Sequence, residues 1–340
     1  MFYLKNPENI LFSPYNSTQK RKDSLKLIDD FVNKGIFKRL DLSDKEVIEK
    51  YIGDNSFADL TFSMLWAWNE TYNYCIHEFE NAVFLVGVGI DDTADCFFMR
   101  KSGTEINKYI RYIAEEFFIR GYSLKLENIA ERDIETLKET ELLAENEANL
   151  SYDRDYSDYI YSTDNFINMC GNLNKSKRSK YNNFIRNHPD VKYVRYTKEL
   201  YNDAVKIFQQ WCSFHECGNC RYGCEYNAFL RMIDLYDRCE KMLIGMTYEN
   251  GEPLSFAIAE FINESEVSFY MQKNSQRITG LTYYLELKML EDMPKAKSVN
   301  MGEDMGVEGL RKDKNSYHPD FMKHKFRMII ENKAKRVILK

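Results

Sequence analysis

Residues 253–304 have the sequence PLSFAIAEFINESEVSFYMQKNSQRITGLTYYLELKMLEDMPKAKSVNMGED, and their pattern indicates the architecture of the chain. Runs rich in aromatic and β-branched residues predict two strands joined by a hairpin. A glycine turn follows, then a helix whose apolar residues recur at helical spacing, and then a third strand. The predicted elements are Pro253–Phe261, Glu266–Lys273, the helix from Leu281, and Ser298–Gly302.

The turn before the helix has the sequence Arg277-Ile278-Thr279-Gly280-Leu281-Thr282. A turn at a helix start leaves backbone N–H groups at the positive end of the helix dipole, which suits a phosphate or pyrophosphate. The order Arg-x-x-Gly-x-Thr resembles the pyrophosphate loop of the GCN5-related N-acyltransferases (GNATs), with Thr282 where that loop has a small residue. The alternative is an ordinary strand–helix turn, because short motifs also occur without function.

The composition is that of a globular protein. The chain has 340 residues, enough for about two domains, with 44% apolar and 29% charged residues. The apolar run Ala82–Ile90 is too short to span a bilayer, and the N-terminus lacks the pattern of a secretory signal. We therefore expect a cytoplasmic protein without a transmembrane segment, whose eight cysteines are free thiols.

The net charge of −6 hides two basic segments. Residues 174–198 contain eight Lys or Arg and one acidic residue, and residues 311–340 contain ten Lys or Arg and three acidic residues. A basic face on an acidic protein indicates a polyanionic ligand such as a phosphorylated cofactor, tRNA or an anionic headgroup. The alternative is two solvated faces that never meet.

The chain is predicted to consist of a helical extension and two similar units. Residues 1–36 form the extension, residues 37–150 the first unit and residues 151–340 the second, with Leu150–Ser162 as the linker. Strands and helices of the two units correspond at an offset of roughly 170–175 residues, which indicates an internal duplication. In the first unit Glu105 follows Arg100-x-x-Gly103 and would repel a phosphate, so we expect that unit to be a degenerate structural copy.

Three further stretches resemble a known family. They are Tyr161–Gly171 leading into Lys177–Phe184, the segment Asn300–Lys312 closed by Ser316–Pro319, and Phe57–Trp66. Together they are similar to the bacterial family related to the soluble C-terminal domain of phosphatidylglycerol lysyltransferases. The resemblance covers nearly everything after residue 36, and it implies two tandem GNAT-like folds with mixed central sheets flanked by helices. In the lysyltransferases such a domain moves lysine from lysyl-tRNA to a lipid headgroup.

Acyl transfer needs a base for the nucleophile and a donor for the oxyanion. Glu303 and Asp304 follow the third strand, and we expect one of them to bind or deprotonate an amine acceptor. Glu260 is a second candidate base, and Tyr317 could return a proton to the leaving group. The alternatives are loop carboxylates that cap the next element and a tyrosine that serves as a packed anchor.

Cationic side chains are the candidate contacts of the donor's phosphates. Besides Arg277, Thr279, Gly280 and Thr282, they are Lys177, Arg178, Arg311 and Lys312. The segment around Lys177 also carries aromatic residues, which suits RNA, but it equally suits a helix whose lysines extend over a core.

Four cysteines lie close together: Cys212, Cys217, Cys220 and Cys224, with His215 among them. Such ligands could wrap zinc or an iron–sulfur centre. Their spacing matches neither a zinc ribbon nor a ferredoxin, so free thiols in a connection between helices are the favoured interpretation.

The sequence therefore predicts an aminoacyl- or acyltransferase of the α/β class. The donor is aminoacyl-tRNA according to the resemblance or acyl-CoA according to the glycine turn, and the acceptor is a small molecule or headgroup with an amine or hydroxyl. No tightly bound cofactor is expected. The alternative is a non-catalytic protein of the same fold that binds RNA or an anionic metabolite.

Overall fold

Two mixed sheets form the framework of the computed structural model, which describes residues 18–53, 57–101, 105–139, 146–169, 171–214 and 224–333. The first seven-stranded sheet has the order β1 (Lys38–Arg39), β2 (Cys75–Phe79), β3 (Ala82–Val88), β4 (Ala94–Arg100), β5 (Leu124–Ile129), β14 (Phe326–Ile330), β6 (Ala148–Tyr152). The second has the order β13 (Phe321–Lys323), β7 (Asp158–Ser162), β12 (Ser298–Asn300), β11 (Glu266–Asn274), β10 (Glu252–Phe261), β9 (Met242–Glu249), β8 (Lys192–Arg195).

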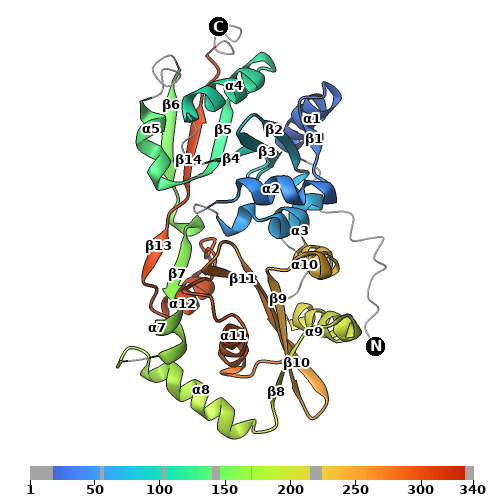
Figure 1. Cartoon of the computed structure of the whole chain (residues 1–340), viewed down its shortest axis with the longest axis vertical. Coiled ribbons are helices and arrows are strands. Elements are labelled where there is room, and N and C mark those ends of the chain that lie inside the picture. The colour runs from blue at the N-terminus through green and yellow to red at the C-terminus, as the bar shows by residue number, and fades with distance from the viewer. Residues whose placement is uncertain are drawn as a thin grey trace.

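Helices cover both faces of each sheet (Figure 1). Those of the first half are α1 (Gln19–Asn33), α2 (Lys45–Tyr51), α3 (Phe62–Tyr72), α4 (Ile106–Ile119) and α5 (Ile134–Lys138). Those of the second half are α7 (Thr163–Asn168), α8 (Lys175–Asn187), α9 (Tyr201–Phe214), α10 (Glu225–Leu235), α11 (Leu281–Glu291) and α12 (Glu308–Asn315). Short 3₁₀ turns include η4 (Ala58–Leu60), η5 (Glu131–Asp133) and η8 (Tyr236–Arg238).

The same motif occurs once in each sheet. In the first, β3 and β4 pair antiparallel, and α4 then leads to β5, which is parallel to β4. In the second, β10 and β11 pair antiparallel, and α11 leads to β12, which is parallel to β11. The predicted α/β architecture with two mixed sheets and the predicted internal duplication are confirmed.

The turns of the second unit follow from their sequences. Asn250 and Gly251 both have positive φ (51° and 83°), as the two central residues of a type I′ hairpin require. In the next hairpin Asn263 Oδ1 accepts hydrogen bonds from the backbone N–H groups of Ser265 and Glu266, which closes the turn with a side chain.

The chain crosses between the two sheets twice. The chain leaves the first sheet after β6 and enters the second as β7, and it leaves the second after β13 and returns to the first as β14 (Figure 1). Residues 326–330, which the sequence prediction placed with the second unit, therefore lie in the first sheet. The strands β7 and β13 pair antiparallel, and the two crossing segments lie side by side.

Two sequence predictions fail in this region. The linker predicted at Leu150–Ser162 instead contributes β6 and β7, and Tyr159, Ile160 and Tyr161 are fully buried. Two of its acidic residues, Asp155 and Asp158, pair with Arg311 and Lys325 from distant segments. The charged segment Glu131–Ala148 is also predicted from its sequence to be helical, but within the described residues only α5 is α-helical there, and Ala148 begins β6.

Three main hydrophobic cores hold the molecule together. The largest core lies between the sheets, where α2 and α3 of the first unit meet α9 and α10 of the second. A second core joins the far face of the first sheet to α1, α4 and α5, and a third joins the far face of the second sheet to α7 and α11. The N-terminal helix α1 is part of this packing through Leu27, Ile28 and Phe31.

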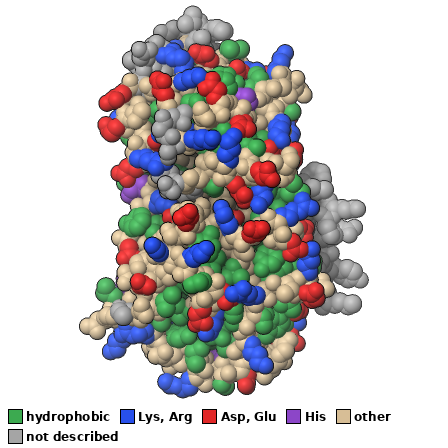
Figure 2. All heavy atoms as spheres, viewed as in Figure 1, with side chains coloured by type: hydrophobic (Ala, Val, Ile, Leu, Met, Phe, Trp, Pro, Cys, Tyr) green, Lys and Arg blue, Asp and Glu red, His purple; other side chains and the backbone are tan. Residues whose placement is uncertain are grey.

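Charges of both signs are interspersed over the face that Figure 2 shows, and cationic side chains lie at its lower end, over α8. Within the described part of the chain, no helix has the length and apolar character needed to cross a membrane.

Candidate functional site between the two units

The strands β11 and β12 diverge soon after they begin. Their parallel pairing joins Glu266–Ser268 to Ser298–Asn300 only, while β11 continues to Asn274. The chain beyond Asn300 turns away and carries Glu303 and Asp304, one of which was predicted to bind or deprotonate the acceptor. The carboxyl ends of the strands are a common place for a ligand in open α/β sheets.

A buried lysine joins the two units at this position. Lys325 lies between β13 and β14, and its Nζ is 2.6 Å from Asp59 Oδ2, 2.7 Å from Asp158 Oδ1 and 2.9 Å from Glu303 Oε2. Asp59 comes from η4 of the first unit and the other two carboxylates come from the second. We call these four residues the Lys325 cluster.

One cation faces three carboxylates in the Lys325 cluster, so the charges do not balance. Burial raises the pKa of Glu303 above its ordinary value, Lys325 opposes the shift, and the neighbouring Asp59 and Asp158 add to it. The side chains of Glu303 and Asp59 are 23% and 37% exposed, whereas that of Asp158 is fully buried. Glu303 is therefore the carboxylate of the second unit's diverging strands that combines a raised pKa with access for a substrate.

Asp304, the neighbour of Glu303, has a different environment. Its carboxylate accepts hydrogen bonds from the guanidinium groups of Arg154 and Arg311, from Tyr159 Oη at 2.5 Å and from the Gly306 backbone N–H at 2.9 Å. Burial alone would raise the pKa of Asp304, but these bonds outweigh burial and hold the pKa well below its usual range. Its side chain is fully buried, so this carboxylate holds the loop in place.

The second candidate base, Glu260, lies on the face of β10 that meets the first unit. Its Oε1 accepts a hydrogen bond of 3.1 Å from Ser63 Oγ, whereas its buried Oε2 has no partner among the described residues. Burial raises the pKa of Glu260 to about 7, and the nearby hydroxyls of Ser63 and Tyr270 oppose this rise. Tyr270 is the extra residue of a bulge in β11, and its hydroxyl is 2.8 Å from Thr61 Oγ1.

The segment Asp59–Ser63 thus supplies the first unit's side of the site. Asp59 pairs with Lys325, Thr61 bonds to Tyr270 and Ser63 bonds to Glu260. Thr61 is also the N-cap of α3, which explains why the chain turns here. The segment belongs to one of the stretches that resemble the lysyltransferase family, but no pattern in its residues indicates that it contacts the second sheet.

The glycine turn before α11 is packed beneath α8. Gly280 has φ of +94°, and a Cβ there would lie 2.8 Å from Phe184 Cβ and 2.9 Å from the carbonyl oxygen of Lys180. Thr282 Oγ1 accepts a hydrogen bond from Asn274 Nδ2 at 2.8 Å, which ties the helix start to β11. Arg277 and Thr279 are exposed, and Arg277 makes no hydrogen bond or ion pair with the described residues.

The cations of α8 have three different roles. Lys175 and Lys180 are exposed. Arg178 donates to the carbonyl oxygens of Met169 and Gly171 and so fixes the loop after α7. Lys177 turns inward and places its ammonium on the ring of Tyr317, and burial lowers the pKa of Lys177 to about 7.

Lys177 and Tyr317 border a carboxylate that the sequence analysis missed. Glu286 of α11 is fully buried and accepts hydrogen bonds from Gln272 Nε2 at 2.7 Å and from Tyr317 Oη at 3.2 Å. Burial raises the pKa of Glu286 to about 7. The sequence offered one signal for this site, namely an acidic residue within a helix, α11, that is apolar on several sides.

The second basic segment is mostly used inside the molecule. Arg311 pairs with Asp155 and Asp304, Lys323 with Glu266 and Arg327 with Glu127. Lys312 is exposed beside Glu308. Over the described residues, this segment and α8 therefore do not form one continuous basic face.

The cysteine cluster can be described only in part. Cys75, Cys96, Cys224 and Cys239 are free thiols and Cys212 lies in α9, whereas Cys217 and Cys220 lie outside the described residues. The described ranges contain no group of three or more metal-ligating side chains.

The two similar sheets define a tandem α/β fold. The family model described as "Phosphatidylglycerol lysyltransferase, C-terminal" matches residues 53–329. The chain therefore belongs to this family, as its resemblance predicted. No curated protein matches it in sequence.

Solved structures share the fold at low identity. A conserved protein of unknown function from Bacteroides thetaiotaomicron has a TM-score of 0.79 at 21% identity, over 87% of this chain and 99% of that one. FemX has a TM-score of 0.62 at 10% identity, over 89% and 99%. The C-terminal domain of a protein named a putative lysylphosphatidylglycerol synthetase from Agrobacterium fabrum has a TM-score of 0.61 at 12% identity, over 87% and 95%. These similarities confirm the predicted fold.

Proposed function

We propose that this protein transfers an activated aminoacyl or acyl group to an amine or hydroxyl acceptor. The description of the family names a lysyltransferase, which supports aminoacyl-tRNA as the donor. The glycine turn before α11 supports acyl-CoA as the alternative donor. The observation that carries the proposal is Glu303, a partly exposed carboxylate at the diverging strands whose pKa is raised. A general base works best when its pKa is near the operating pH.

Glu303 would take the proton from the acceptor as its nitrogen or oxygen attacks the donor's carbonyl carbon. Lys325 holds the Glu303 carboxylate in position. The extra residue of a β-bulge is unpaired in the ladder, so the Tyr270 backbone N–H is our candidate for stabilising the oxyanion. Asp304 and Arg311, whose groups are committed to each other, have no direct role in this proposal.

The donor would bind at the start of α11. Arg277 and Lys180 project from the turn and from the helix that packs on it, and such groups suit phosphate oxygens. The exposed Lys175 and Arg186 of α8 would extend the contact along the backbone of a tRNA.

Donor affinity tests this assignment. In the double variant Arg277→Gln/Lys180→Gln, two phosphate contacts are lost, and we expect affinity for the donor to fall by roughly tenfold or more. Lys138→Gln, an exposed change on α5, is the control and should leave affinity unchanged. The measurement is a binding titration with charged tRNA and with acetyl-CoA; equal affinities in all three proteins would place the donor elsewhere.

A further inference from the structure

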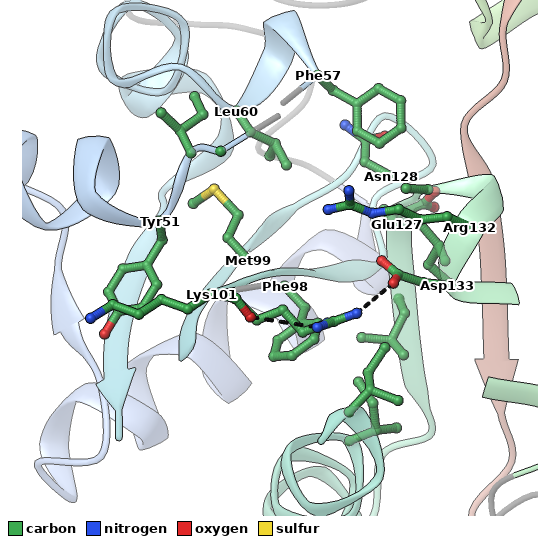
Figure 3. Close-up of a pocket in the computed structure, with 18 of the residues that line it drawn as sticks. Tyr51, Phe57, Leu60, Phe98, Met99, Lys101, Glu127, Asn128, Arg132 and Asp133 are labelled. Atoms are coloured by element: carbon green, nitrogen blue, oxygen red, sulfur yellow. Dashed lines mark hydrogen bonds and ion pairs between the residues drawn. The ribbon is translucent and has the colours of Figure 1, made fainter. Parts of the chain in front are cut away.

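A cavity of about 230 Å³ opens in the first unit (Figure 3). The parallel strands β4 and β5 pair only at Cys96–Phe97 and Leu126–Glu127, and the cavity lies where they diverge. It therefore occupies the same position in the first unit that the diverging strands β11 and β12 occupy in the second. This unit is the one that the sequence predicted to be a degenerate copy.

The floor of the cavity is apolar and comes from both faces of the sheet. Ile106 and Ile110 belong to the first turns of α4, and Phe57 and Leu60 belong to the segment before α3. All four side chains are less than 5% exposed. Apolar lining of this kind, with a few polar groups at the edge, is typical of small-molecule sites.

Arg132 provides a positive charge at the edge of the cavity. Figure 3 shows its guanidinium extending from η5 into the hollow. The neighbouring Asp133 is already paired with Arg100, at 2.7 Å, and Arg132 itself makes no hydrogen bond or ion pair with the described residues. An unengaged guanidinium above an apolar floor favours a ligand with an anionic end and an apolar end.

Asn128 connects the cavity to the Lys325 cluster. It lines the cavity from a bulge in β5 and has φ of 53°, a left-handed conformation that asparagine tolerates. Its Nδ2 donates to Asp59 Oδ2 at 3.2 Å, and the same oxygen accepts from Lys325 Nζ. An occupant that contacts Asn128 is therefore linked through Asp59 and Lys325 to Glu303.

We propose that this cavity binds a small amphipathic carboxylate. The carboxylate would lie on the Arg132 guanidinium, which can bind both oxygens, and the apolar group would lie on Ile106, Ile110 and Leu60. The volume lies below the roughly 300–1,000 Å³ typical of sites for drug-sized ligands, which favours a molecule of the size of leucine. An apolar amino acid and a short branched acid share this chemistry. The proposal does not depend on the transfer reaction, because the site is in the other unit.

Calorimetry with the full chain and three matched probes tests the proposal. Leucine and 4-methylpentanoate both carry the carboxylate, whereas leucinamide has the same apolar group without it. We expect the two carboxylates to bind and leucinamide to fail. Tighter binding of leucine would identify an amino acid as the ligand, and equal binding would identify an acid recognised without its amine.

Arg132→Gln removes the charge at an exposed position, so the variant should fold. We expect it to weaken binding of both carboxylates by roughly tenfold or more, while Arg238→Gln, an exposed change on η8, leaves binding unchanged. The proposal is overturned if neither carboxylate binds at about 10 mM, if leucinamide binds equally well, or if Arg132→Gln has no effect. Since no donor is present, any of these results leaves the proposed transfer reaction intact.

Discussion

At the scale of single residues, neighbouring carboxylates of one loop have opposite environments. Glu303 faces a cluster with too many negative charges, whereas Asp304 is surrounded by two guanidinium groups, a tyrosine hydroxyl and a backbone N–H. Their adjacency in sequence predicted that both lie near the diverging strands. It could not predict which one is neutralised, because Arg154 and Lys325 come from segments about 150 and 20 residues away.

Glu260 gives a prediction about stability and pH. Its pKa is about 7 in the folded protein against an ordinary value of 4.5, so the folded state retains a proton that the unfolded chain releases. The stabilisation is fully present below about pH 4.5 and is lost as the pH rises through about 7, a difference of up to about 3 kcal/mol.

Glu260→Gln removes this titration. The free energy of unfolding of the variant relative to wild type should therefore rise between about pH 5 and pH 8, measured by denaturant unfolding at several pH values. Glu264→Gln, an exposed change in the next hairpin, controls for the loss of a charge. A constant difference between Glu260→Gln and wild type across this range would show that Glu260 ionises at its ordinary pKa.

At the scale of elements, α8 illustrates what its sequence could and could not decide. The aromatic and basic residues of 177–184 were equally consistent with an RNA-binding surface and with a helix packed on a core. The structure shows that its aromatic residues Tyr181 and Phe184 pack against apolar side chains of α11, while Lys175 and Lys180 are exposed. The periodicity identifies the buried face, but not the inward turn of Lys177.

The turn beneath α8 can be tested with two glycines of similar conformation. Gly280 and Gly251 both have positive φ, but only Gly280 has neighbours within 4 Å of an added Cβ. Gly251→Ala should cost about 1 kcal/mol for the left-handed backbone alone. Gly280→Ala should cost about 1–3 kcal/mol more, because it overpacks the contact with α8.

Denaturant unfolding of both variants checks this expectation. If both substitutions lower the free energy of unfolding equally, α8 accommodates the added methyl group without loss of stability. The packing of α8 on the turn then does not hold the site together.

At the scale of the whole molecule, the duplication followed from local patterns, but the exchange of strands did not. Hydrophobic runs predicted β10 and β11 well, because each is a buried strand in a hairpin. The partner of a strand is a long-range choice, and no pattern in residues 326–330 distinguishes the first sheet from the second. The cavity of the first unit was missed for the same reason, since its walls come from five separate segments of the chain.

Lys325 links the two units at the crossing point, and its removal should destabilise the whole protein. Lys325→Met leaves Asp59, Asp158 and Glu303 without their cation, and breaking such a buried pair costs about 3–5 kcal/mol. The loss of stability should be larger at pH 8 than at pH 5.5, because at pH 8 the carboxylates are no longer neutralised by protonation.

The exposed pair of Lys312 and Glu308 provides the control, since Lys312→Met should change stability by less than about 1 kcal/mol. Thermal and denaturant unfolding measure both variants. A cost for Lys325→Met no larger than that of the control would contradict the bridging role.

The central claim is that Glu303 acts as the base of a transfer reaction. The most direct measurement is single-turnover transfer from radiolabelled aminoacyl-tRNA, and from radiolabelled acetyl-CoA, to phosphatidylglycerol vesicles and amino acids, with wild type, Glu303→Gln and the exposed control Glu308→Gln. We expect the wild-type rate to rise with pH through the raised pKa of Glu303 and to level off above it. Glu303→Gln should be slower by roughly 100-fold or more, without that rise and with unchanged donor affinity. Equal rates for Glu303→Gln and wild type, or donor binding without any transfer by the wild type, would contradict the claim, and the second result would indicate a binding protein.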